Sequence, residues 1–117
     1  MKEKSYTRST RIADLIKEEV ATIFLSEVSD PRVKGITITD VKIGDDLKLA
    51  KIYYVTSEKH ENQTTIEGLG KVKGFIRREM AKRISMRRVP EIEFHYDDVF
   101  EQGVKMENVF RDIKNGK

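Results

Sequence analysis

The chain has 117 residues, the length of a single domain, with 37% charged residues, 38% apolar residues and no cysteine. The absence of cysteine excludes disulfides, thiolate metal sites and cysteine nucleophiles. No uncharged run approaches the roughly 20 residues that a membrane-spanning helix requires. Because no apolar stretch follows the charges of the amino terminus, we expect no secretory signal and a cytoplasmic location.

The net charge is only +3, but the basic residues are concentrated in one segment. Residues 71–88 carry eight lysines and arginines and one glutamate, whereas the segments on either side have a small acidic excess. A solvated helix face usually mixes the two signs, because opposite charges three or four positions apart stabilise the helix. This segment forgoes most of that support, so its excess of positive charge predicts contact with the phosphates of a polyanion.

The first half of the chain predicts a helix followed by a hairpin. Apolar residues recur at steps of three and four over 12–24, with Ser9 or Thr10 as the expected cap and Pro31 just beyond the end. The alternation of the next two segments predicts two strands, 36–43 and 50–56, joined by a turn. The phase slips near Asp40, so we expect a β-bulge there.

The second half predicts two helices, a third strand and a tail helix. Helical periodicity runs from about 61 to 86, but it includes Gly68, Gly70 and Gly74, and each glycine costs about 1 kcal/mol relative to alanine in a helix. We therefore expect a kink or break near Gly74 that makes two helices. A strand follows at 92–96, and a weaker helix is expected from Val104 to Ile113. The order α-β-β-α-α-β predicts an α+β domain over residues 1–98, whose helices cover one face of the sheet, with a helical tail at 99–117.

This order is that of a type II KH domain, which usually clamps nucleic-acid backbone with a Gly-x-x-Gly loop. No two glycines here stand three apart, and Val72-Lys73-Gly74 takes the place of the loop. From about Ser5 to Ile113 the chain resembles the ribosome-binding factor A family. Six stretches carry the resemblance in the family's order: Arg8 and Arg11, Asp30 to Val33, Ile36 to Val41, Asp46-Leu47 with Ala50 to Tyr53, Gly74 to Arg77, and Arg87 to Phe94 with Tyr96-Asp97. The resemblance implies a KH-like type II fold with a kinked middle helix pair, in which Val72 replaces the alanine of the family's Ala-x-Gly kink.

The resemblance also implies a function without catalysis. A member of this bacterial family would bind the immature free 30S ribosomal subunit and its 16S rRNA near the decoding region. It would aid late 16S rRNA processing and 30S maturation, matter most in the cold, and leave the mature subunit. We expect a cytoplasmic monomer that needs no cofactor or metal, acts away from membranes, and has a ribosome-assembly GTPase as a further partner.

The predicted RNA-binding residues are the basic side chains of the 71–88 segment and of the first helix, together with the hinge glycine. At 100° per residue, Lys71, Arg78 and Lys82 fall within about 40° of one another. Residues after Gly74 are expected to offer free N–H groups and a positive helix end to a phosphate. The full set is Arg8, Arg11, Lys71, Lys73, Gly74, Arg77, Arg78, Lys82, Arg83, Arg87 and Arg88.

Other polar and aromatic residues receive structural interpretations. Asp45-Asp46 and Asp97-Asp98 are expected in a turn and at a helix start rather than on a metal. His95 is expected to be solvated and Tyr54 buried, whereas Tyr53 is left open; Phe75 is either a core residue or a stacking platform for a base. Two other functions stay open: a generic KH-type RNA-binding regulator that prefers short single strands, and a small metal-dependent nuclease, which needs converging carboxylates.

Overall fold

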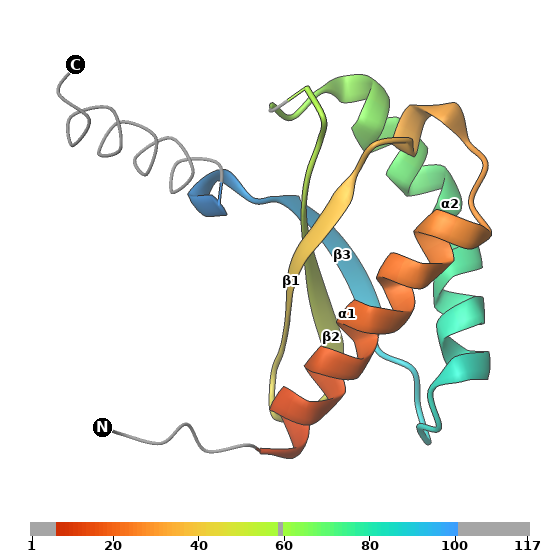
Figure 1. The fold of residues 1–117 in the computed structure, drawn as a ribbon. Helices are drawn as coiled ribbons and strands as arrows, with labels where there is room; N and C mark the ends of the chain where they lie inside the picture. Colours follow the sequence, from red (N-terminus) through yellow and green to blue (C-terminus); the bar gives the residue numbers. More distant parts are fainter. Residues whose placement is uncertain (1–6, 59, 101–117) are drawn as a thin grey trace, which may run out of the picture.

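The computed structural model describes residues 7–58 and 60–100, in which two long helices lie against a three-stranded sheet (Figure 1). In chain order the elements are α1 (Arg8–Ser26), the short 3-10 helix η1 (Pro31–Val33), β1 (Thr37–Ile43), β2 (Leu49–Val55), α2 (Gln63–Arg83) and β3 (Glu91–Tyr96). All three strands lie within one residue of their predicted bounds. The tail helix expected from Val104 to Ile113 lies outside the described residues.

The start of α1 is capped by Thr7, whose hydroxyl accepts a hydrogen bond from the backbone N–H of Thr10 (3.1 Å). The predicted caps, Ser9 and Thr10, are therefore wrong. Ser9 is instead buried and donates a hydrogen bond to Asp45 (3.1 Å), which ties the start of α1 to the β1–β2 turn. This contact brings the amino end of α1 to the same end of the molecule as the turn (Figure 1).

The sheet has the order β1-β2-β3, with β1 and β2 antiparallel and β2 and β3 parallel. The register between β1 and β2 shifts between Ile38 and Asp40, which confirms the predicted bulge. Because the bulge inserts one residue, Ile38 and Val41 are both buried although they are three positions apart. The parallel pairing of β2 with β3 requires a crossover connection, and α2 supplies it.

α2 is one helix that continues through all three glycines, so the predicted division into two helices is wrong. Its ribbon changes direction along its length without an interruption (Figure 1). Gly68 lies against η1: a Cβ at this position would stand 2.7 Å from the Cβ of Arg32 and 2.9 Å from Cγ1 of Val33. Only glycine permits this approach, and the packing offsets its low helix propensity of about 1 kcal/mol.

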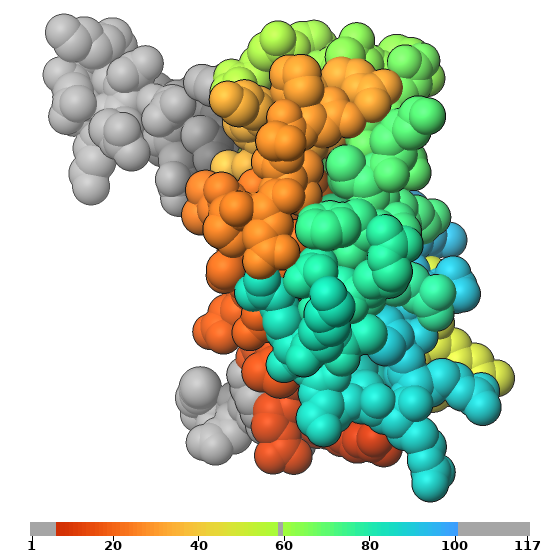
Figure 2. Space-filling model, turned by 90° about the vertical axis from the view of Figure 1, so that its right-hand side faces the viewer, coloured from red at the N-terminus to blue at the C-terminus, as the bar shows by residue number. Residues whose placement is uncertain are grey.

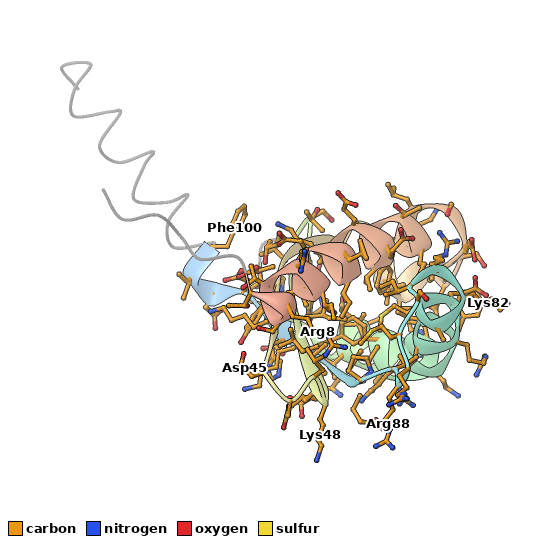
Figure 3. All side chains as sticks on the ribbon, turned by 90° about the horizontal axis from the view of Figure 1, so that it is seen from below. Arg8, Asp45, Lys48, Lys82, Arg88 and Phe100 are labelled. Atoms are coloured by element: carbon orange, nitrogen blue, oxygen red, sulfur yellow. The ribbon has the colours of Figure 1, made fainter. Side chains whose placement is uncertain are left out.

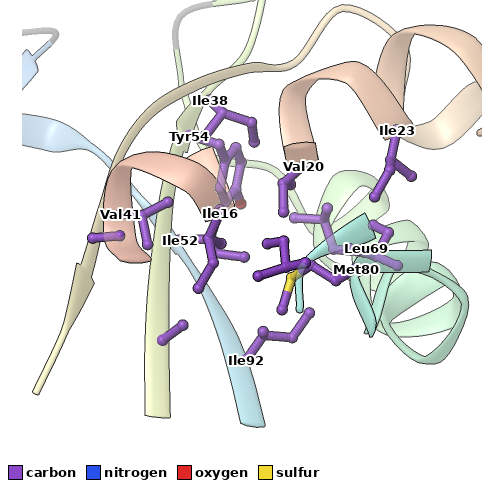
Figure 4. Packing of buried hydrophobic residues seen from close by; sticks show 14 of the residues in the cluster. Ile16, Val20, Ile23, Ile38, Val41, Ile52, Tyr54, Leu69, Met80 and Ile92 are labelled. Carbon is purple, nitrogen blue, oxygen red and sulfur yellow. The ribbon is translucent and has the colours of Figure 1, made fainter. Parts of the chain in front are cut away.

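A single hydrophobic core fills the space between the two helices and one face of the sheet (Figure 4). Its largest fully buried side chains come from both helices and from two strands: Tyr54, Ile16, Ile23, Ile52, Ile76, Met80, Ile92 and Val20. Tyr54 is buried as predicted, and burial raises the pKa of its hydroxyl to about 12. Since Ile76 and Met80 hold one face of α2 in the core, the opposite face of α2 is left to solvent.

Candidate nucleic-acid interface

A stripe of exposed basic residues, formed by Lys71, Arg78 and Lys82, runs along the solvent face of α2. Figure 2 shows α2 extending down this side of the molecule with α1 beside it. Because α2 is continuous, all three side chains share the helical face predicted for them. Lys82 contacts Glu79 (3.1 Å), but its side chain is 71% exposed, so a phosphate can compete for it at little cost.

Gly74 does not supply the phosphate seat that the sequence predicted. Its neighbours lie inside an uninterrupted helix, so their N–H groups take part in helical hydrogen bonds and no helix end forms there. A Cβ at Gly74 would lie 3.6 Å from Nη1 of Arg78, an ordinary contact distance, so the packing at this position does not require glycine. The side chain of Arg78 therefore folds back over Gly74 on the outer face of α2.

Arg83 is held by three carboxylates between the two helices. Its guanidinium contacts Glu19 (3.4 Å) and Glu27 on or beside α1, and Glu79 (3.9 Å) on α2. Its side chain is only 26% exposed. Hydrogen bonding from Lys82 and the positive charges of Lys82 and Arg83 lower the pKa of Glu79. These contacts engage Arg83 in joining α1 to α2, a role that sequence reasoning missed.

Arg77 is likewise engaged within the fold. Its Nε donates a hydrogen bond to the carbonyl of Pro90 and its Nη2 donates to that of Val89, both at 2.9 Å. Nη2 also lies 3.4 Å from Glu91. Arg77 therefore fixes the segment that leads from α2 into β3, and only part of its guanidinium remains for a ligand.

The start of α1, the β1–β2 turn and the segment after α2 all lie at the lower end of the molecule in Figure 1. Together with residues of α2 and the start of β3, they line a hollow of about 380 Å³. We call this cavity the basic hollow. Its basic lining comes from the start of α1, the β1–β2 turn, α2 and the segment after α2: Arg8, Lys48, Arg77, Arg87 and Arg88. Figure 3 views this end directly and places Arg8, Lys48 and Arg88 on it. Lys48 is absent from the predicted set, because a single lysine in a turn gives no sequence signal.

The remaining predicted residues are not brought into either group. Lys73 is half-buried and lines a small hollow with Tyr54 and Phe94, away from the stripe. Arg11 is exposed on α1 and does not line the basic hollow. Phe75 packs against the core and also borders an open groove beside Lys71, so its role in stacking stays a prediction.

The acidic pairs have the structural uses that the sequence predicted. Asp46 accepts a hydrogen bond from the backbone N–H of Lys48 (3.1 Å) in the β1–β2 turn. Asp97 accepts one from Phe100 (2.9 Å) at the start of a helical turn and another from the hydroxyl of Thr39 (2.5 Å). Within the described ranges, no three acidic, histidine or cysteine side chains come together as metal ligands.

The outer face of the sheet carries Tyr53, whose role the sequence left open, and His95, which was predicted to be solvated. Their rings are 5.6 Å apart, and Lys42 lies over the ring of Tyr53 at the same distance. His95 also contacts Glu93 (2.9 Å) and is partly exposed, in agreement with its predicted solvation. Neither described helix is long and apolar enough to cross a membrane.

The fold and its basic surface define a small α+β domain of the KH-like class, in which one bent helix replaces the middle helix pair. The chain belongs to the ribosome-binding factor A family, whose family model matches residues 8–110. A ribosome-binding factor A from Thermodesulfovibrio yellowstonii is 38% identical over 109 residues, which cover 93% of this chain and 92% of that protein.

Two solved structures have the same fold. The crystal structure of ribosome-binding factor A from Thermus thermophilus superposes with a TM-score of 0.68 at 22% identity, covering 75% of this chain and 93% of that one. Coordinates of the T. thermophilus factor fitted into a cryo-EM map of a 30S–RbfA complex give a TM-score of 0.61 at 23% identity, covering 71% and 88%. These likenesses confirm the predicted KH-like fold. The predicted family is confirmed by the family model and by the 38% identical relative.

Proposed function

We propose that the protein is a ribosome-assembly factor that binds the immature free 30S subunit and its 16S rRNA. It aids late 16S rRNA processing and 30S maturation, including growth in the cold, and leaves once the subunit is mature. The observation that carries this proposal is the basic surface, made of the α2 stripe and the basic hollow, on a domain of the ribosome-binding factor A family. The complex formed by the T. thermophilus relative supports the choice of the 30S subunit as partner.

The chemistry of this surface is that of binding. Arginine and lysine neutralise phosphates and release counterions, which supplies affinity for RNA without any covalent step. RNA helices present a deep, narrow major groove, so recognition relies on backbone contacts and shape. In this proposed role the protein is a cytoplasmic monomer that acts without catalytic activity, cofactor or metal. A ribosome-assembly GTPase is its further partner.

Sucrose-gradient sedimentation of the tagged protein from cells tests this function. We expect the protein to migrate with free 30S subunits and to be absent from 70S ribosomes. A protein that stays at the top of the gradient and binds short single-stranded RNAs would be a generic KH-type regulator instead. RNA cleavage by the purified protein with Mg²⁺ present would contradict the proposed absence of catalysis.

A further inference from the structure

The basic hollow has features that a flat phosphate-binding surface does not need. Beside its basic residues it is lined by apolar side chains from the β1–β2 turn and from the segment after α2: Leu47, Met86, Val89 and Pro90. Its volume of about 380 Å³ falls in the range of pockets that hold small ligands. A hollow with an apolar lining and a cationic rim suits a ligand that has both an apolar and an anionic part.

The cationic rim is available to such a ligand. Among the described residues, the side chains of Arg8, Lys48, Arg87 and Arg88 form no hydrogen bond or ion pair. The two acidic residues at the hollow are already engaged: Asp46 caps the turn and Glu91 lies 3.4 Å from Arg77. Arg77 is a positioning residue here, because its hydrogen bonds hold Val89 and Pro90 in the wall.

Leu47 adds a second, independent observation. It has a φ of 57° and is the non-glycine residue with a positive φ in the described part of the chain. Leucine is strained in this left-handed region, where glycine and asparagine are favoured. Strained residues tend to persist where their side chain serves a function, and the side chain of Leu47 lines the basic hollow.

We propose that the basic hollow binds one unpaired nucleotide, with the base against Leu47 and Met86 and the phosphates against Arg8, Lys48 and Arg88. An unpaired base offers an apolar face next to its anionic backbone, which a paired base in a helix hides. This inference rests on the proposed function and deepens it: the stripe on α2 contacts RNA backbone, while the basic hollow selects an RNA segment with an extruded or single-stranded nucleotide.

Methyl NMR of the full chain with ¹³C-labelled methionine tests the site directly. The chain has four methionines, of which Met86 lines the hollow and Met80 is buried in the core and serves as an internal control. A single-stranded RNA hexamer should shift the Met86 signal and leave Met80 in place. Adenosine monophosphate should produce a weaker shift of the same signal, because it carries the same chemistry without the flanking backbone. A fully paired duplex that shifts Met86 as strongly as the hexamer would overturn the proposal.

Two pairs of variants separate binding from folding. Leu47→Asn places a residue suited to the left-handed region and removes the apolar surface, so we expect unchanged thermal stability and hexamer affinity reduced by roughly fivefold or more. Leu25→Asn removes a leucine that is 89% exposed on α1 and should leave affinity unchanged. Lys48→Ala should make the salt dependence of hexamer binding shallower by about 0.7, as expected for one lost contact to a single strand. Lys51→Ala, on the exposed side of β2, should leave the salt dependence of hexamer binding unchanged.

The nucleotide site and the binding to 30S subunits are distinguished by different results. If the hexamer leaves the Met86 NMR signal unchanged while the protein still migrates with 30S subunits, the nucleotide site is overturned and the proposed function stays intact. If the hexamer shifts the Met86 signal but the protein does not migrate with 30S subunits, the nucleotide site is supported and the proposed ribosomal function is overturned. Equal effects of Leu47→Asn and Leu25→Asn on affinity would also overturn the site.

Discussion

Replacing Arg83 by methionine should destabilise the protein without weakening its electrostatic contact with RNA. Methionine retains the apolar stem and removes the charge, leaving Glu19, Glu27 and Glu79 without their shared partner. Exposed ion pairs contribute up to about 1 kcal/mol, and breaking a buried pair costs about 3–5 kcal/mol. Because the side chain of Arg83 is 26% exposed, we expect an intermediate loss of about 2 kcal/mol. This corresponds to a decrease in melting temperature of roughly 10 °C for a domain of this size.

Lys82→Met is the matched control, since Lys82 contacts the same Glu79 from an exposed position. Its free energy of unfolding should change by no more than about 0.5 kcal/mol. Thermal unfolding followed by circular dichroism measures both variants, and binding to purified 30S subunits at several salt concentrations gives the slope of affinity against salt. We expect Arg83→Met to keep the wild-type slope. Wild-type stability together with a slope shallower by about 1 would show that Arg83 contacts phosphate, and would refute this assignment.

Three further predictions concern the stripe, the α1–β1 connection and the glycines of α2. Alanine at both Arg78 and Lys82 should make the salt slope of 30S binding shallower by about 2 with stability retained, and an unchanged slope would remove the stripe from the interface. Hydrogen bonds from Arg32 lower the pKa of Asp30 from 3.8 to about 2, so its stabilising contribution is present above about pH 4 and is lost as the pH falls towards 2. Asp30→Asn should therefore lose less stability over that pH range in acid titration than the wild type, and an equal loss would contradict the pairing. Gly70→Ala should raise the free energy of unfolding by about 1 kcal/mol, because a Cβ at this position meets open space. Gly68→Ala should lower it, because its Cβ would collide with η1. Equal stability of the two variants in urea unfolding would contradict the packing of Gly68 on η1.

The strands were predictable because their signals are local. Alternation of apolar residues and the turn after Ile43 set the hairpin, and the change of phase near Asp40 located the bulge. The predicted break in α2 is wrong, because the reason for a glycine at position 68 is a tertiary contact and not local helix propensity. Gly68 is required by its contact with η1, which lies more than thirty positions earlier in the chain, so its presence carries no information about a break.

The candidate site was predictable in its charge but not in its division of roles. The excess of positive charge indicated the segment that carries most of the exposed basic side chains, and helical spacing placed Lys71, Arg78 and Lys82 on one face of α2. Whether this face binds RNA stays a prediction. Arg77 and Arg83 belong to the same charged run, but their guanidinium groups bind partners within the fold. Arg77 donates hydrogen bonds to backbone carbonyls, and Arg83 forms ion pairs with carboxylates. Lys48 lies outside the run and joins the candidate site only because the hairpin turn lies against the segment that follows α2.

The central claim, that one basic surface binds the small ribosomal subunit, is tested most directly by reversing charge on two faces of the molecule. One variant carries Arg78→Glu with Arg88→Glu, and its control carries Lys42→Glu with Lys51→Glu on the outer face of the sheet. Both change the net charge by the same amount, and both are followed by sedimentation with purified 30S subunits. We predict that the control migrates with the subunit and that the first variant remains at the top of the gradient. Equal loss of binding by both variants would show that net charge, rather than this surface, is responsible, and retention of both on the subunit would place the interface elsewhere.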